Sequence, residues 1–240
     1  MTHVLAVSGS LRRQKGATTR ILAPFLEGMK GEGASVELVY VKDCRIEPCR
    51  GEFHCWYEKP GQCIIKDGMQ DLYNKLRAAD ILVIATPVYI PLPGEMQNFF
   101  NRLCPLIEPL LDFRDGRTRG RIHGDYRIRK IALVSSGDWW EKENCGTVLR
   151  ICEELAKDMS VEFSGALLRP HAGLMEEHEE KGKLIAEAAR SAGSQLVKEG
   201  RMSQVLLEAV SQPLVEEETL RARFNRAYQK AIDRQEYLNR

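Results

Sequence analysis

Three cysteines and one histidine lie close together in the stretch PCRGEFHCWYEKPGQC, residues 48–63, and Cys44 lies just upstream. Thiolates and imidazole nitrogens bind zinc and, for thiolates above all, iron–sulfur clusters. The same residues can also be loop thiols without a metal. The chain has seven cysteines, an odd number, and its start, MTHVLAVSGS, lacks the features of a signal peptide. We therefore expect a reducing cytoplasmic environment, in which disulfides are the less favoured use of these cysteines.

A second group of candidate residues follows the first apolar run of the sequence. The run Val4–Ser8 leads directly into GSLRRQKGATT, residues 9–19, and a helical pattern comes next. Free N–H groups and the helix dipole make such a junction an anion site. The motifs G-x-G-x-x-G and G-K-[ST] are both absent, which excludes the two common nucleotide loops. An ordinary turn capped by Thr18 is the alternative. The side chains that suit a terminal phosphate monoester are Ser10, Arg12, Thr18 and Thr19.

Two further loops are expected at the same edge of the fold. They are TPVYIPLPGEMQNFFNRL, residues 86–103, and SSGDWWEKENCG, residues 135–146. Tyr89, Trp139 and Trp140 offer surfaces on which a flat ligand can stack. Backbone N–H groups near residues 88–90 and 137–138 could donate to its polar edge. A phosphate at one end and a stacked ring system at the other describe flavin mononucleotide (FMN).

The elements that must position these loops alternate along the chain. Apolar, β-branched runs predict strands, and between them lie amphipathic helical patterns, although Pro24 weakens the first of these. A β-α-β-α order implies a parallel sheet, and five strands suit the doubly wound α/β sheet whose ligand lies beyond the carboxyl ends of its strands. The predicted strands are Val4–Ser8, Val36–Tyr40, Ile81–Thr86, Ile131–Ser135 and Val161–Leu168.

Composition narrows the class of protein further. Hydrophobic residues make up 43% of the 240 residues and charged residues 29%, which is typical of a soluble globular protein. The formal net charge of +1 gives no field that would attract nucleic acid or an anionic membrane. No apolar run approaches the roughly 18 residues of a membrane helix. We therefore expect neither nucleic acid nor membrane as a partner.

The segments GSLRRQKGATT, CIIKDGMQDLYNKLRAADILVIATPVY, GEMQNFFNR and FSGALLRPHAG together resemble the family of NADPH-dependent FMN reductases and iron–sulfur flavoproteins. The resemblance covers roughly residues 3–200 and implies the flavodoxin-like fold. It also implies that Ser10, Arg12 and Thr18 hold the FMN phosphate, although the loop is one residue longer than usual after Arg12. The residues implied beside the ribityl chain and the ring are Pro87, Val88, Tyr89, Ser136, Gly137, Asp138 and Trp139.

Members of this family that carry a cluster show a compact C-x2-C-x2-C-x4-7-C pattern in the same insertion. Here Cys49, Cys55 and Cys63 match three of the four positions, and Glu52 occupies the second. Cys44 and His54 are the other candidates for a fourth ligand, and neither is in register. Zinc bound by the three cysteines and His54 is chemically permissible but awkward to close. With one thiolate missing, the sequence narrowly favours no metal over a 4Fe-4S cluster.

The resemblance implies an enzyme in which the flavin is the reactive group, so no catalytic acid, base or nucleophile is assigned. NAD(P)H would reduce FMN, and a quinone, flavin, azo or nitro compound would accept the electrons. The alternatives are an iron–sulfur flavoprotein that exchanges electrons with ferredoxin-type partners and a flavodoxin-like carrier. Carriers tend to be small and acidic, which favours the enzyme. A homodimer or homotetramer is expected because the flavin sites of this family usually lie between subunits.

Residues 1–200 are expected to form the FMN-binding domain, with residues 41–68 as its cysteine-containing insertion and residues 201–240 as a helical extension. The apolar stripe of the extension either packs on its own domain, which we favour, or against a second subunit in an oligomer. The stripe consists of Leu220, Phe224, Tyr228 and Ile232. Residues 110–130 carry many cations and are interpreted as a lid or dimer loop, with the phosphate of NADPH as a less favoured partner. The default for Cys104, Cys145 and Cys152 is a buried core thiol.

Overall fold

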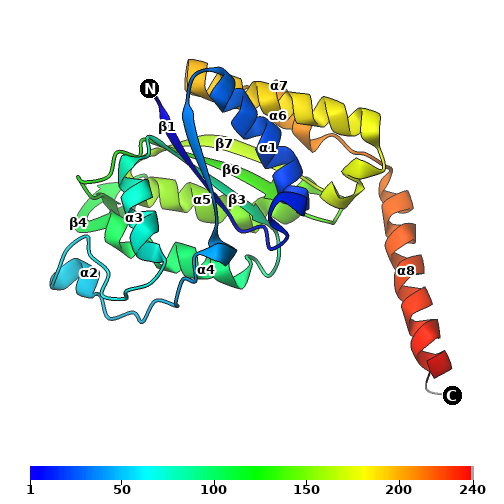
Figure 1. Ribbon diagram of the computed structural model, residues 1–240, viewed down its shortest axis with the longest axis horizontal. Coiled ribbons are helices and arrows are strands. Elements are labelled where there is room, and N and C mark those ends of the chain that lie inside the picture. The colour runs from blue at the N-terminus through cyan, green and yellow to red at the C-terminus, as the bar shows by residue number, and fades with distance from the viewer. Residues whose placement is uncertain (239–240) are drawn as a thin grey trace.

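Five parallel strands form the central sheet, in the order β2-β1-β3-β6-β7 (Figure 1). The structure is a computed structural model that describes residues 1–238, with side chains through residue 235. All five predicted strands are confirmed to within one residue at each end. The strands are β1 (His3–Ser8), β2 (Ser35–Tyr40), β3 (Ile81–Pro87), β6 (Lys130–Ser136) and β7 (Glu162–Arg169). The apolar runs of β1, β3 and β6 are buried between two helical layers, whereas the edge strand β2 is only partly buried.

Helices cover both faces of this sheet, as the flavodoxin-like fold requires (Figure 1). One face carries α1 (Ala17–Gly31) and α6 (Glu179–Glu199); the other carries α3 (Met69–Ala78), α4 (Gly94–Asn101) and α5 (Gly146–Met159). Helices α1 and α6 touch through glycines. A Cβ on Gly28 would lie 1.9 Å from the Arg190 carbonyl oxygen, and one on Gly193 would lie 1.9 Å from the Phe25 carbonyl oxygen. These two glycines therefore set how closely the helices approach.

The segment interpreted as a lid or dimer loop is instead an antiparallel hairpin. It consists of β4 (Ile107–Arg114) and β5 (Arg117–Ile122) and packs against α5. Arg119 is buried and pairs with Asp158, 2.7 Å away, and with Glu154, 3.0 Å away. Its neighbours Arg117 and Arg121 also form ion pairs within the domain. The expected role as a lid is thus wrong for this segment, and its cations are largely neutralised by acids of the same domain.

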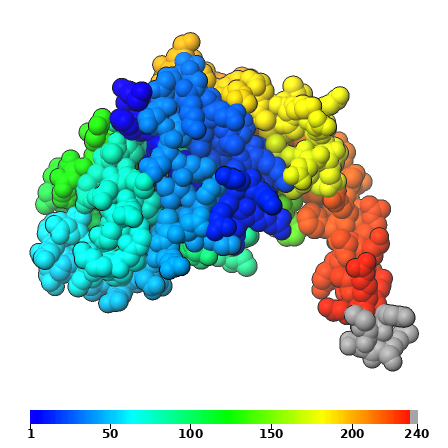
Figure 2. Space-filling model, in the orientation of Figure 1, coloured from blue at the N-terminus to red at the C-terminus, as the bar shows by residue number. Residues whose placement is uncertain are grey.

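The C-terminal extension begins as part of the domain and then leaves it. Helix α7 (Gln204–Ser211) packs on β7 and α6, and Leu214 and Leu220 are buried in the core. Helix α8 (Glu217–Leu238) projects away from the body, as Figures 1 and 2 show. The favoured expectation that the stripe packs on its own domain holds for Leu220 and in part for Phe224, whose ring faces Trp139. It is wrong for Tyr228, which is exposed. Among the described residues, no helix has the length and apolar character to span a membrane.

Candidate functional site

A cavity of about 320 Å³ opens at the carboxyl ends of β1, β3 and β6. This is the edge where doubly wound sheets bind their ligands. Three loops meet there, and nine of the eleven predicted FMN-binding residues line it. They are Ser10, Arg12, Thr18, Pro87, Val88, Tyr89, Ser136, Gly137 and Asp138. The other lining residues are Leu11, Lys15, Gly16, Ala17, Arg20, Gly173 and Glu176.

The first loop joins β1 to the N-terminus of α1 in a tightly folded path. Gly16 stands at the N-cap of α1, and a Cβ at this position would lie 2.0 Å from Ser10 Oγ. Only glycine therefore lets the loop close against the helix. The first N–H groups of α1 have no acceptor within the helix. They lie at the carboxyl edge of the sheet, where an anion could accept from them. Thr18 Oγ1 lies 2.7 Å from Ser136 Oγ in a buried hydrogen bond, which joins this loop to the one after β6.

Three cations line the cavity near the N-terminus of α1. Arg20 pairs with Glu176, whereas Arg12 and Lys15 form no ion pair with the described part of the chain. Arg12 and Lys15 are also exposed, so they are free to meet an anion. The intervening Arg13 points elsewhere: it pairs with Asp43, and this contact lowers the pKa of the Asp43 carboxyl. The loop thus presents Arg12 and Lys15 to the cavity and turns Arg13 away from it.

Backbone hydrogen bonds hold the second and third loops in place. The Val88 N–H donates to the Ser136 carbonyl at 2.8 Å, and the Tyr89 N–H donates to the Pro91 carbonyl at 2.8 Å. The Gly137 N–H donates to the Arg169 carbonyl at 3.0 Å. These three amides were expected to be available to a ring edge, but the fold uses them. Tyr89 itself is half exposed at the cavity and offers an aromatic face.

Two predicted residues do not line the cavity. Thr19 is buried, and its hydroxyl donates to the Arg13 carbonyl at 2.7 Å, so it shapes the first loop from within. The Trp139 ring instead faces Phe224 of α8, with 5.6 Å between ring centroids. Trp140 also turns away, because its indole N–H donates to the Val215 carbonyl at 2.9 Å. The sequence analysis placed Trp139 and Trp140 at the site only because they are aromatic. In the structure both side chains contact the C-terminal extension.

His171 lies beside this edge but is a structural residue. Its backbone N–H donates to the Trp139 carbonyl at 3.0 Å, and its Nε2 accepts the Leu214 N–H at 2.9 Å. Burial, reinforced by Arg169, lowers the pKa of His171 to about 4. The imidazole is therefore neutral at pH 7 and serves to hold the third loop against the extension.

A second cavity, of about 380 Å³, lies between the insertion and the C-terminal end of α4. Cys49, Cys55 and Cys63 all line it, and so does Glu52. Cys104, whose expected place was the core, lines it as well. All seven cysteines are free thiols, and burial raises the pKa of Cys55 to about 12. Among the described residues, no three His, Cys, Asp or Glu side chains converge closely enough to hold a single metal ion.

Comparison with known proteins confirms the resemblance seen in the sequence. Residues 2–117 match the NADPH-dependent FMN reductase family. An iron–sulfur flavoprotein of Archaeoglobus fulgidus is 38% identical over 116 residues, which cover 48% of this chain and 57% of that protein. The corresponding protein of Methanosarcina thermophila is 30% identical over 100 residues, 41% of this chain and 51% of that protein. The chain spans about half the length of these curated relatives.

Solved structures agree on the fold over a longer part of the chain. The NAD(P)H:quinone oxidoreductase of Methanothermobacter marburgensis superposes with a TM-score of 0.55 at 17% identity. The superposition covers 81% of this chain and 96% of that structure. At this identity the likeness concerns the fold, and it extends the flavodoxin-like assignment beyond residue 117.

Proposed function

Because the first half of this chain matches the NADPH-dependent FMN reductase family, we propose that the protein is an FMN-dependent oxidoreductase that takes electrons from NAD(P)H and delivers them to a small acceptor. The observation that carries this proposal is the first cavity. At the carboxyl edge of the sheet, this cavity combines a helix N-terminus suited to an anion, the hydroxyl pair of Thr18 and Ser136, and the half-exposed ring of Tyr89. Its volume lies in the usual range for small-molecule sites.

Each side of the cavity suits one part of FMN. The N-terminus of α1, with Ser10, Arg12 and Thr18, would hold the phosphate through hydroxyls, amides and one or two cations. Pro87 and Val88 would flank the ribityl chain, and Tyr89 would contact the ring. Bound FMN supplies the redox chemistry itself, by accepting hydride at N5 and releasing electrons to an acceptor.

We assign to this chain's own residues the binding and orientation of the cofactor, and no acid, base or nucleophile among them. Asp138 is exposed at the opposite wall, where its carboxylate and backbone can meet the polar edge of the ring. The cavity is open and Tyr89 and Ile90 are exposed at its rim, so a flat nucleotide or acceptor can approach the ring face. We propose quinones, free flavins, azo compounds or nitro compounds as acceptors on this basis.

The direct test is FMN binding followed by reduction. Apo-protein titrated with FMN should bind one equivalent, and Thr18→Val should weaken binding about 10-fold, since it deletes a hydroxyl proposed to hold the phosphate together with its buried hydrogen bond to Ser136. Thr118→Val makes the same change on the exposed face of β5 and should leave binding unchanged. NADH or NADPH should then bleach the flavin without air, and a quinone should restore it. If FMN binds but neither nucleotide reduces it, the reductase proposal fails and a flavodoxin-like carrier remains.

A further inference from the structure

The second cavity brings together cysteines that are far apart in the sequence. Three come from the insertion and are called here the insertion cysteines: Cys49, Cys55 and Cys63. The fourth thiol belongs to Cys104, 41 residues beyond Cys63, in the 3-10 turn Cys104–Leu106 that follows α4. Four thiols around one cavity are the donor set of a four-iron cluster.

Hydrogen bonds fix the insertion to the segment that carries Cys104. The Trp56 indole N–H, from the short helix α2 (His54–Tyr57), donates to the Cys104 carbonyl at 2.9 Å. The Asn98 amide donates to the Ile46 carbonyl at 2.9 Å. These hydrogen bonds therefore hold Cys104 beside the insertion cysteines.

Arg102 closes the base of this cavity. Its side chain is 1% exposed and donates to the Glu47 carbonyl at 2.8 Å and to Asp67 at 2.7 Å. These bonds clamp both ends of the insertion. Arg102 Nε is buried and has no hydrogen-bond partner within the described part of the chain. A buried guanidinium N–H without an acceptor suits a site whose occupant is anionic, and a cluster held by thiolates carries net negative charge.

The other candidates for a fourth ligand are engaged elsewhere. The Cys44 thiol contacts the Tyr40 carbonyl at 3.5 Å and does not line the cavity. His54 Nδ1 is 2.9 Å from Glu58 on the surface. Glu52 lines the cavity, but iron–sulfur clusters take thiolates in preference to a carboxylate.

The grouping of the donors argues against a single zinc ion. Around a single tetrahedral ion with bonds of about 2.3 Å, ligand sulfurs lie only about 4 Å apart. No three donors among the described residues are grouped in that way. A 4Fe-4S cluster needs no convergence on one ion, because each thiolate binds a different iron, and the wall of this cavity is largely apolar. The apolar members are Phe53, Phe100, Leu103, Pro105, Ile107 and Leu155.

The relatives named iron–sulfur flavoproteins imply a 4Fe-4S cluster in this insertion, and we propose that in this chain its fourth ligand, beside the insertion cysteines, is Cys104. The four thiols release their protons to solvent as they bind. The sequence alone favoured no metal because the position of the second cysteine is Glu52; the fold replaces that missing thiolate from a different element. The proposal goes beyond the proposed function and does not require bound FMN.

The test is the cluster content of the full chain purified without air, or reconstituted with iron, sulfide and a thiol reductant. We expect about four irons and four acid-labile sulfides per chain. Cys104→Ala should lose the four-iron form, leaving no iron or a three-iron cluster visible by electron paramagnetic resonance. Cys63→Ala, in another element, should do the same. Cys44→Ala and Glu52→Gln are the matched controls and should keep the full content.

Circular dichroism and FMN content measured on the same samples separate this proposal from misfolding and from the proposed function. Cys104→Ala should retain the wild-type spectrum and FMN. Full iron in Cys104→Ala, or loss of iron in Glu52→Gln with retention in Cys104→Ala, overturns the assignment of the fourth ligand. A wild-type chain that binds FMN but takes up no iron overturns the cluster and leaves the oxidoreductase standing. A chain that takes up iron but no FMN supports the cluster and overturns the oxidoreductase.

Discussion

At the scale of single residues, the buried pair of Arg169 and His171 has the clearest consequence. Arg169 donates to the Val210 and Gln212 carbonyls at 2.7 Å, and one of its terminal nitrogens lies 3.2 Å from His171 Nε2. The Leu214 N–H also donates to that nitrogen. With two donors facing it, Nε2 must be unprotonated, so the proton is on Nδ1. The neutral imidazole thus joins the third loop of the first cavity to the start of the C-terminal extension.

The pH dependence of stability follows from this arrangement. The pKa of His171 falls from 6.5 to about 4 on folding, so between these values the unfolded state binds the proton and the folded state does not. Stability is therefore complete above about pH 6.5 and declines as the pH falls toward 4, by about 2 to 3 kcal/mol. Urea unfolding at pH 7 and pH 5 should show most of this loss, about 2 kcal/mol. His171→Asn, which tolerates the left-handed backbone there, should reduce it, and the exposed His3→Asn should not.

At the scale of elements, Arg102 is the joint between α4 and the cysteine insertion. It pairs with Asp67, which is itself nearly buried and also accepts the Glu47 and Met69 N–H groups. Although burial opposes it, the hydrogen bonds from Arg102 and these amides lower the pKa of the Asp67 carboxyl. The pair thus connects the start of the insertion, its end and the first turn of α3.

Replacing Arg102 by methionine should therefore destabilise the protein strongly. The substitution keeps an apolar stem of similar length but leaves a buried carboxylate without its cation, which costs about 3 to 5 kcal/mol. Arg121→Met removes the exposed pair with Glu108, 3.0 Å apart, and should cost less than about 1 kcal/mol. Urea denaturation of both variants measures the difference. Equal effects would mean that the Arg102 pair contributes no more than a surface ion pair.

The elements also show which parts of the structure could be predicted. The five strands and the meeting of three loops follow from apolar runs in a β-α-β order, since parallel strands deliver their loops to one edge. The hairpin was missed because arginines and acids interrupt its alternation and are neutralised only in three dimensions, as at Arg119. Cys104 was missed because a single cysteine near apolar residues looks like a core thiol. Its role depends on a contact across 41 residues, which no local pattern encodes.

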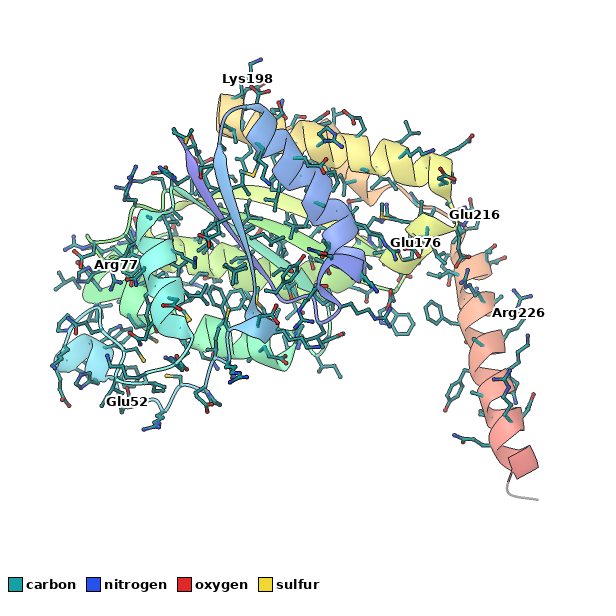
Figure 3. All side chains as sticks on the ribbon, viewed as in Figure 1. Glu52, Arg77, Glu176, Lys198, Glu216 and Arg226 are labelled. Atoms are coloured by element: carbon teal, nitrogen blue, oxygen red, sulfur yellow. The ribbon has the colours of Figure 1, made fainter. Side chains whose placement is uncertain are left out.

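At the scale of the whole molecule, the insertion and the arm formed by α8 lie at opposite ends. Figure 3 shows Glu52 of the insertion at one end and Arg226 of the arm at the other. The arm is anchored at its base by Leu220 and by the ion pair of Arg223 with Glu177. Beyond that base, its side chains through residue 235 are mostly exposed. Most of the stability of a helix in a protein comes from packing against other elements. We therefore expect that the arm, which makes few contacts with its own domain, packs against a partner.

We expect that partner to be a second copy of the chain. Phe224 contacts Trp139, and these rings are 41% and 60% exposed, so together they form an apolar patch that continues to Tyr228. The wild-type chain should sediment as a dimer in analytical ultracentrifugation, and Phe224→Asp combined with Tyr228→Asp should give a monomer, because it places charges in the contact. Leu184→Asp, at an equally exposed leucine on α6, should leave the mass unchanged. A double variant that sediments like the wild type would show that the arm does not hold subunits together. Because Trp139 follows directly on Asp138 at the first cavity, loss of the dimer should also weaken FMN binding.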